Sequence, residues 1–314
     1  MLTIRHFKKG FDEDSYLRIY NTAFSDYDDI RHVTPEEMKK METSPGYTTE
    51  GCIIAEWNGE VAGMVDAHVD PLREEKKGFI QNLSVLPQFR RKGIARKLVE
   101  KALESLKQRG METVETWAQS DREGCVHIYE SFGFKAARYT SLMKRSLRSI
   151  PRGVGENTDV AIRDLSMRSD ADIELLNRLD NETFKEHHNF RPRTLEETKY
   201  ALFDMPWFDK QAWFFAETAG QPVGYAGGAI DEGLNKEKGL KWGWIWDIGV
   251  LKSHRRKGVA TRLMIRTMEW LKGAGMEEAM LYVDDLNPMK AIELYWKLGF
   301  NVHRKSIICE LRIA

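Results

Sequence analysis

The sequence predicts an α/β protein in which one mixed-sheet domain is present twice, and three observations support this prediction. The 314 residues suffice for about two domains at the usual ~100–200 residues each. Hydrophobic residues make up 42% of the chain and only nine residues are prolines, so the chain can bury real cores. Residues 79–93 (FIQNLSVLPQFRRKG) match residues 244–258 (WIWDIGVLKSHRRKG) at seven of fifteen positions.

The similarity extends to both sides of this segment. At the starts of the halves, TIRHF (3–7) corresponds to AIRDL (161–165). Near their ends, HIYESFGF (127–134) corresponds to ELYWKLGF (293–300). A period of roughly 160 residues is far longer than the ~20–50 residues of a solenoid unit, so it indicates a duplicated domain.

The boundary between the copies is marked by composition. RSIPRGVGENT (148–158) combines one proline and two glycines with polar residues, as exposed connectors do. We therefore expect an N-terminal domain over residues 1–150, a linker over 151–158 and a C-terminal domain over 159–314.

Each half is expected to open with a short strand and a helix, and Asp12 and Asp170 mark the two helix starts. In the first half, CIIAEW-NG-EVAGMVDAHV (52–69) predicts two strands joined by an Asn-Gly hairpin turn. In the second half, WFFAET-AGQP-VGYAGGAI (213–230) predicts the same hairpin with a four-residue loop.

Next comes a strand that ends at Val85 or Val250, then a basic turn with a glycine, then a helix. Apolar residues recur at helical spacing in both helices: Ile94, Leu98, Ala102 and Leu106 in the first, and Val259, Leu263, Thr267 and Leu271 in the second. Gly110 and Gly275 stand where a helix C-terminal glycine belongs. A further strand (113–118 or 279–283), a short helix and a terminal strand complete each half.

Charge and composition exclude several classes of function. Lys plus Arg equals Asp plus Glu, at 48 each, so no overall basic field exists to hold a nucleic acid or an anionic membrane. No apolar stretch approaches the ~18–20 residues that span a bilayer, and charges begin at Arg5, so we expect no signal peptide and a cytoplasmic protein. Three dispersed cysteines predict neither disulfides nor a metal site. Monomer and homodimer both stay open, because two fused copies can mimic a dimer.

The basic turns are candidate phosphate sites. Where a strand turns directly into a helix, the first helical N–H groups are unpaired and the positive end of the helix dipole lies at the turn. The glycine permits close backbone approach, and the cations offset ligand charge. The two candidate sets are Arg90, Arg91, Lys92, Gly93, Ile94 and Ala95, and Arg255, Arg256, Lys257, Gly258, Val259, Ala260 and Thr261. Neither a Walker nor a Rossmann motif occurs, which argues against nucleoside triphosphate chemistry.

With these turns in place, both halves of the chain resemble the GCN5-related N-acetyltransferases (GNAT), whose hallmark is [Q/R]-x-x-G-x-[G/A] at the start of such a helix. The second half also carries the pattern that follows the hallmark in this family, namely Asn287, Ala291, Tyr295, Gly299 and Phe300. Through NETFKEHHNFRP (181–192) the chain is more loosely similar to mycothiol synthase-like tandem members.

The resemblance implies two tandem GNAT domains, each with a mostly antiparallel mixed sheet whose fourth and fifth strands splay apart. It implies acetyl-CoA as donor, with its diphosphate on the basic turn. Its pantetheine arm would then lie along backbone groups near Ile248 and Val250, or Leu83 and Val85 in the first half, and beside Asn287.

The chemistry needs a base for the amine and a proton donor for the departing thiolate. The resemblance assigns the acid role to Tyr295, because a tyrosine near pKa ~10 can donate to a thiolate near ~8.5. In the first half Tyr129 matches Tyr295, but Asp121 and Cys125 replace Asn287 and Ala291. We therefore expect catalysis in the second half and a degenerate first half that is either cofactor-binding or structural, with Cys125 a neutral thiol.

The base is not identified. Family members place Glu or His where this chain has Trp244 and Trp246. Asp247 should point to the opposite face unless a β-bulge intervenes. Further candidates for the base are Asp284, Asp285 and Glu217.

Two further features of the second half allow two interpretations each. Trp213, Trp242, Trp244 and Trp246 form either a packed sheet face or an aromatic acceptor pocket. His187–Arg193 forms either a solvated loop or part of the acceptor site, and metal binding by its adjacent histidines is disfavoured.

Three hypotheses follow. The first is an N-acetyltransferase acting on the amine of a small molecule or peptide, with catalysis in the second half. The second is a non-catalytic acyl-CoA-binding protein, because both fourth strands lack the usual carboxylate. The third is two active sites with different acceptors.

Overall fold

The computed structural model describes residues 1–151 and 159–314, which fold into two compact units. Unit 1 comprises Met1–Tyr139 and Lys305–Ala314, and unit 2 comprises Thr140–Arg304. Apart from Pro151, the predicted linker 151–158 lies outside the described residues.

Unit 1 contains one six-stranded sheet with the order β1-β2-β3-β4-β5-β12. Neighbouring strands are antiparallel except for the parallel pair β4–β5. Its elements are β1 (Leu2–His6), α1 (Glu13–Ala23), α2 (Pro35–Met41), β2 (Cys52–Trp57), β3 (Glu60–Val69), β4 (Lys77–Val85), the 3-10 turn η1 (Pro87–Phe89), α3 (Ile94–Gln108), β5 (Thr113–Gln119), α4 (Glu123–Glu130), and parts of β6 (Lys135–Ser146) and β12 (Asn301–Arg312).

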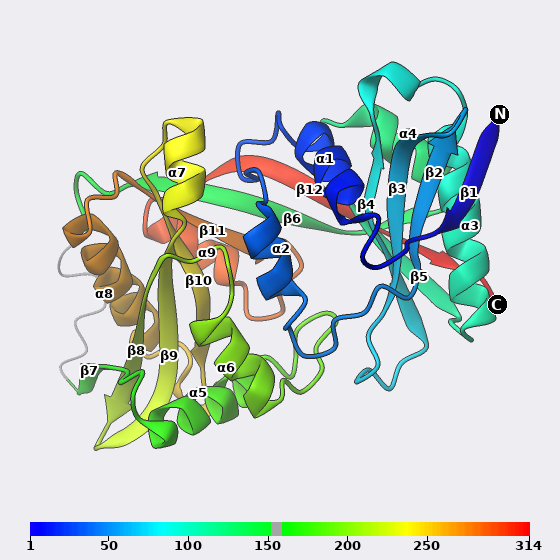
Figure 1. The fold of residues 1–314 in the computed structure, drawn as a ribbon. Coiled ribbons are helices and arrows are strands. Elements are labelled where there is room, and N and C mark those ends of the chain that lie inside the picture. The colour runs from blue at the N-terminus through cyan, green and yellow to red at the C-terminus, as the bar shows by residue number, and fades with distance from the viewer. Residues whose placement is uncertain (152–158) are drawn as a thin grey trace. The chain divides into compact units, whose positions relative to one another are not determined.

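Unit 2 repeats this arrangement with the order β7-β8-β9-β10-β11-β6, in which β10–β11 is the parallel pair (Figure 1). Its elements are β7 (Val160–Asp164), α5 (Asp170–Thr183), α6 (Leu195–Phe203), β8 (Lys210–Thr218), β9 (Gln221–Ile230), α7 (Glu232–Lys238), β10 (Trp242–Val250), the 3-10 turn η2 (Lys252–His254), α8 (Val259–Gly273), β11 (Glu278–Asp284) and α9 (Ala291–Lys297). The mixed, mostly antiparallel sheet predicted for each half is confirmed.

The two halves of the chain exchange their last strands. The C-terminal strand β12 pairs with β5 of unit 1, from Ser306 opposite Gln119 to Arg312 opposite Thr113. The matching strand β6 of the first half pairs with β11 of unit 2. The compact units therefore differ from the continuous halves 1–150 and 159–314. Strands β6 and β12 occupy the same place in the repeat, so sequence similarity does not reveal which sheet each one joins.

The hairpin turns follow from residues that tolerate positive φ. Asn58 and Gly59 have φ of 53° and 86°, the conformation of a two-residue type I′ turn, as the Asn-Gly pair predicts. In unit 2 the turn is also two residues long, because Ala219 and Gly220 adopt φ of 49° and 73°. The predicted four-residue loop is therefore wrong, since Gln221 already begins β9.

The long helices bury the faces that their spacing predicts. All eight apolar-face positions listed for α3 and α8 are at most 2% exposed. Gly110 follows α3 with φ of 78°, and Met111 N–H bonds back to the Leu106 carbonyl, which closes the helix as expected. At the start of α5, the side chain of Ser169 rather than that of Asp170 caps the helix, by accepting from Asp172 N–H.

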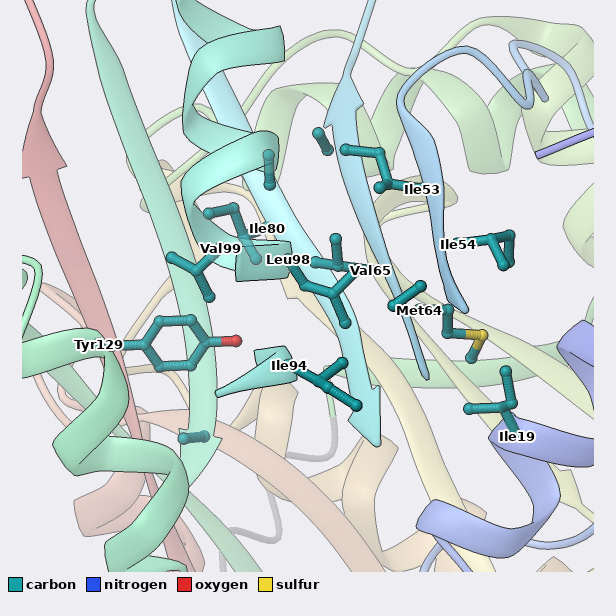
Figure 2. Packing of buried hydrophobic residues seen from close by; sticks show 14 of the residues in the cluster. Ile19, Ile53, Ile54, Met64, Val65, Ile80, Ile94, Leu98, Val99 and Tyr129 are labelled. Atoms are coloured by element: carbon teal, nitrogen blue, oxygen red, sulfur yellow. The ribbon is translucent and has the colours of Figure 1, made fainter. Parts of the chain in front are cut away.

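The sheet of unit 1 carries a helix on each face. Figure 2 shows Leu98 and Ile94 of α3 packed with Val65 and Ile80, all at most 1% exposed. On β3 the next residue, Asp66, accepts a hydrogen bond from Tyr16 of α1. Because successive strand residues face opposite sides, α1 and α3 cover opposite faces of the sheet.

The fourth and fifth strands of each unit separate along their length, as the family resemblance implies. The last paired residues of β4 and β5 are Ile80 and Thr116, although β4 continues to Val85. The last paired residues of β10 and β11 are Trp244 and Met280, although β10 continues to Val250. In both units the backbone of the fourth strand beyond this point lacks a parallel neighbour and can pair with a ligand.

Candidate functional site

A left-handed glycine opens the long helix that follows the splayed strand in each unit. Gly93 and Gly258 are the N-cap residues, with φ of 75° and 81°, and neither helix has a side-chain N-cap. Arg91 and Arg256 also have positive φ, 64° and 61°. This backbone leaves the first N–H groups of α3 and α8 directed at the turn, which is the arrangement that binds phosphate.

The cations of the turn divide into two roles. Arg255 donates from Nε to the Val250 carbonyl (3.1 Å), and its Nη1 pairs with Glu186 (2.7 Å). Arg90 makes the same Nε contact with the Val85 carbonyl (3.2 Å). These first arginines therefore tie the turn to the end of the strand, and the charge of Arg255 is less available to a ligand than expected because Glu186 pairs with it.

The remaining predicted residues of the two turns differ in their exposure to solvent. Arg256 and Lys257 are exposed, Ala260 is half-buried, and Val259 and Thr261 are buried in the first turn of α8. In unit 1, Lys92 is exposed and its ammonium lies over the rings of Trp57 and Phe89. Ile94 is buried and Ala95 half-buried.

Tyr295 lies on α9, 6% exposed, in the core cluster that includes Phe300 and Leu298. Burial raises the pKa of its hydroxyl, and the nearby charge of Asp247 raises it further. Tyr295 is therefore protonated throughout the neutral range. The residue is therefore both a core aromatic and close enough to Asp247 to be affected by its charge.

A β-bulge in β10 brings Asp247 to the face covered by α5. The register with β9 shifts between Ile245 and Asp247. Two residues further on, the Cα of Gly249 approaches α5 so closely that a Cβ there would meet Thr183 Oγ1 at 2.2 Å. Asp247 and Gly249 share a face of the strand, so Asp247 also points toward α5. The bulge is the exception to simple alternation that the sequence left open.

Asp247 is half-buried and lies beside the buried pair Tyr225 and Asp180. The hydroxyl of Tyr225 donates to Asp180 (2.7 Å) and also lies within hydrogen-bonding reach of Asp247. Arg193 pairs with Asp180 at 3.4 Å. Burial raises the pKa of Asp247 to about 7, with a further contribution from the charge of Asp180. A carboxyl group that titrates near neutrality beside a splayed strand is suited to general-base chemistry.

Exposure divides the tryptophans of unit 2. Trp213, Trp242 and Trp244 are at most 7% exposed and belong to core clusters, as the packed-sheet interpretation predicts. Trp246 is 43% exposed, at the bulge, with its ring centroid 4.6 Å from that of Phe208. Tyr282 of β11 is 45% exposed and stacks on Trp244. Among these four tryptophans, Trp246 alone exposes enough of its ring to contribute to an aromatic acceptor surface.

The segment His187–Arg193 lies in the connection between α5 and α6. The ring of His187 contacts that of Phe184 at a tilted angle, with centroids 4.1 Å apart, and its Nε2 is buried without a hydrogen-bond partner in the described part of the chain. Burial lowers the pKa of His187, so the imidazole is neutral at neutral pH. Sequence reasoning did not single out Asp180 or Tyr225, because neither belongs to a recognised motif.

The other candidates have local structural roles. Glu217 pairs with Arg163 at 2.6 Å on β8, which is not adjacent to the splayed pair. Asp285 accepts from Ser141, and Asp284 accepts from Leu286 N–H. Asn287 accepts from Met289 N–H (2.8 Å), so its side-chain oxygen shapes the turn before α9.

The same positions in unit 1 carry neutral side chains. Asn82 stands where unit 2 has Asp247, and Tyr20 where it has Asp180, by the alignment of the repeats. Tyr129 is buried on α4, and burial raises the pKa of Cys125 beside it to about 11. Unit 1 therefore retains the frame without the titrating carboxylate.

Two general features complete the description of residues 1–151 and 159–314. None of the helices in these ranges is both long and apolar enough to cross a membrane. Within the same ranges, no three His, Cys, Asp or Glu side chains gather closely enough to hold a metal ion.

Comparison with known proteins finds the same family in both units. The model of the Acetyltransferase (GNAT) family matches residues 15–134 and 175–300. Mycothiol acetyltransferase of Streptosporangium roseum is 28% identical over 316 aligned positions, covering 88% of this chain and 90% of the relative. That of Nocardioides sp. is 28% identical over 229 positions, covering 70% and 75%.

Solved structures share the fold along the whole chain. A GCN5-related N-acetyltransferase from Sphaerobacter thermophilus superposes with a TM-score of 0.71 at 20% identity, covering 99% of this chain and 96% of the other. A tandem GNAT protein from the clavulanic acid biosynthesis pathway gives a TM-score of 0.74 at 14% identity, covering 100% and 99%.

Proposed function

Because the chain belongs to the GNAT acetyltransferase family, whose members use acetyl-CoA as donor, we propose that unit 2 transfers acetyl to an amine with Asp247 as base and Tyr295 as acid. The observation that carries this proposal is the bulge that sets Asp247 on the α5 face, where its charge also influences Tyr295. The acceptor is the amine of a small molecule or a peptide. Unit 1, by this proposal, is not catalytic.

The donor binds along the splayed strand and the turn of unit 2. The diphosphate takes the N–H groups at Gly258, Val259 and Ala260, with Arg256 and Lys257 offsetting its charge. The edge of β10 near Ile248 and Val250 that faces away from β9 takes the pantetheine amides. Arg255 acts indirectly, by fixing the turn against the strand end through Val250 and Glu186.

The base acts on the amine before or during attack. The hydroxyl of Tyr225 donates to Asp180 and lies within hydrogen-bonding reach of Asp247, so it links the two carboxyl groups. In the ionised form, Asp247 accepts the proton that the amine loses as its nitrogen bonds to the thioester carbon. A pKa of about 7 suits this step, because the base is substantially ionised yet still basic at neutral pH.

The acid acts on the leaving group. As the carbon–sulfur bond breaks, the thiolate takes the proton of Tyr295 and the tyrosinate is later reprotonated from solvent. Once Asp247 has been neutralised by the amine proton, it no longer raises the pKa of Tyr295. Proton uptake by the base therefore makes the acid stronger at the moment the thiolate forms.

The acceptor is expected between the exposed aromatic faces of Trp246 and Tyr282 and the segment His187–Arg193. A cationic amine is favoured over such rings by cation–π attraction. The relatives named mycothiol acetyltransferase, which are 28% identical to this chain, support mycothiol or a similar small molecule as the acceptor. The unpartnered Nε2 of His187 can accept a hydrogen bond from this acceptor.

Steady-state release of thiol from acetyl-CoA over an amine panel tests this function, with product identified by a mass gain of one acetyl group. Tyr295→Phe should lower kcat by about 10²–10⁴-fold while calorimetry shows unchanged acetyl-CoA affinity. Tyr129→Phe in unit 1 is the matched control and should leave turnover near the wild-type rate. Binding of acetyl-CoA without transfer to any amine would instead support the acyl-CoA-binding alternative.

A further inference from the structure

Unit 1 contains a cavity of about 350 Å³ where β4 and β5 separate. Leu83 and Ala118 of the two strands line it, and Cys125 of α4 closes one side. The opposite wall consists of Tyr20, Phe24 and the loop residues that follow α1. The volume lies near the lower end of the ~300–1,000 Å³ range of small-molecule pockets, so a small ligand suffices to fill it.

The walls of this cavity are aromatic. The rings of Tyr20, Phe24 and Tyr27 form a continuous row, with centroids 4.8 Å and 5.1 Å apart. Phe79 and Trp117 contribute further rings from the strands. An apolar group enclosed here would contact ring surface on several sides and would leave water on binding.

The charged groups near this cavity are paired with other side chains. Glu115 lies in the lining and shares the ammonium of Lys77 with Glu310, at 3.2 Å and 3.1 Å. Asn82 and Tyr20 occupy the positions of the carboxylates Asp247 and Asp180, and the nearby carboxylate of Asp66 accepts from Asn82 and Tyr16, at 2.7 Å each. Unit 1 therefore has no carboxylate at the two positions that carry one in unit 2.

Tyr129, the residue of unit 1 that matches Tyr295, also has different polar neighbours. Thr116 donates its hydroxyl to the Ile80 carbonyl (3.0 Å) and lies within hydrogen-bonding reach of Tyr129. Burial raises the pKa of Tyr129, and this contact with Thr116 lowers it in part. In unit 2 the matching position is Leu281, which has no hydroxyl. The two tyrosines therefore differ in their polar surroundings.

We propose that unit 1 binds, without turnover, an acyl-CoA whose acyl group is apolar and larger than acetyl, and that the acyl chain fills the cavity beside Tyr20, Phe24 and Tyr27. The proposal rests on the proposed function, since it uses the same mode of binding CoA at the turn of Gly93. Only a thioester held at that turn brings an acyl group to Leu83. With no acceptor amine recruited, the space that an acceptor would use is available to the chain.

Calorimetric titration of the full chain carrying Gly258→Asp tests this. Aspartate tolerates the left-handed backbone but repels a diphosphate, so remaining acyl-CoA binding belongs to unit 1. Acetyl-, butyryl- and hexanoyl-CoA are the probes. The dissociation constant should fall by up to about fourfold for each added methylene, and hexanoyl-CoA should bind at least about tenfold tighter than acetyl-CoA.

Cys125 supplies matched variants in the same background. Cys125→Leu narrows the cavity and should reduce the chain-length preference while acetyl-CoA still binds, which also shows that the unit is folded. Cys125→Ser should keep the preference. Adding Gly93→Asp should remove the remaining binding.

Equal affinity for the three thioesters, or consumption of hexanoyl-CoA by the Gly258→Asp chain, would overturn the proposal. Acetyl transfer by the unaltered chain is measured separately, so failure of the proposed function is distinguishable from failure of this one. A chain that transfers acetyl but shows no chain-length preference refutes only the cavity proposal. A chain that shows the preference but never transfers acetyl refutes only the catalytic one.

Discussion

Replacing Asp247 by asparagine isolates the proposed base. The amide keeps the size of the side chain and can still hydrogen-bond to Tyr225, but it cannot accept the proton of an amine. General-base catalysis contributes about 10²–10⁴-fold, so kcat/KM of Asp247→Asn at pH 8 should fall by at least about 100-fold. Acetyl-CoA affinity, measured by calorimetry, should be unchanged.

The pH dependence of kcat/KM gives a second quantitative prediction. With a pKa of about 7 for Asp247, kcat/KM of the wild type should decrease about tenfold for each pH unit below 7. This limb should be absent from Asp247→Asn. Ionisation of the acceptor amine adds a separate limb that both proteins share, so the comparison is made on one amine.

Asp180→Asn is the informative companion variant. Removing the charge of Asp180 should lower the pKa of Asp247, so the acidic limb should move to lower pH. A merely structural role for Asp180 would reduce activity without moving the limb. The reasoning is refuted if Asp247→Asn retains wild-type kcat, or if its limb near pH 7 persists.

Three further predictions concern stability. The folded pKa of Asp247, about 7, lies above the ordinary value of 3.8, so the ionised carboxylate costs stability as pH rises through 7. Asp247→Asn should therefore raise the unfolding free energy at pH 8 by at most about 4 kcal/mol, with a higher Tm, and should change both little below pH 4; the opposite order would contradict the assigned shift. Gly93→Ala should cost about 1 kcal/mol in denaturant unfolding, since its Cβ meets nothing within 4 Å and only the φ of 75° is unfavourable; a loss of 4 kcal/mol would indicate an unrecognised clash. Ile307→Ala should cost about 2–4 kcal/mol and reduce hydrogen-exchange protection in unit 1, where this C-terminal residue is buried; loss of protection confined to unit 2 would argue against the strand exchange.

Features that depend on local chemistry were predictable from the sequence. The Asn58–Gly59 turn, the buried stripe of α3 and the left-handed Gly110 each follow from residue type and spacing over a few positions. The splay of the fourth and fifth strands followed from the resemblance of the turn motifs to a known family. In the structure the splay is seen in the parallel pairing, which ends at Ile80 in unit 1 and at Trp244 in unit 2.

Features that depend on tertiary context were not predictable. One extra residue in β10 is invisible in a strand pattern, yet this bulge decides which face Asp247 occupies. Asp180 and Tyr225 carry no motif, and only the packing of α5 on β9 and β10 brings them to Asp247. Likewise Glu186, which neutralises Arg255, lies 69 residues away in the chain. The exchange of β6 and β12 is hidden because the repeats are alike.

The most direct test of the account compares acetyl transfer by Gly258→Asp with transfer by Gly258→Asn and Gly93→Asp. Aspartate and asparagine both accept the left-handed backbone and differ only in charge. Product formation from acetyl-CoA should be lost in Gly258→Asp, largely kept in Gly258→Asn, and sustained by unit 2 in Gly93→Asp. Transfer that survives Gly258→Asp, or that disappears with Gly93→Asp instead, would contradict catalysis in unit 2.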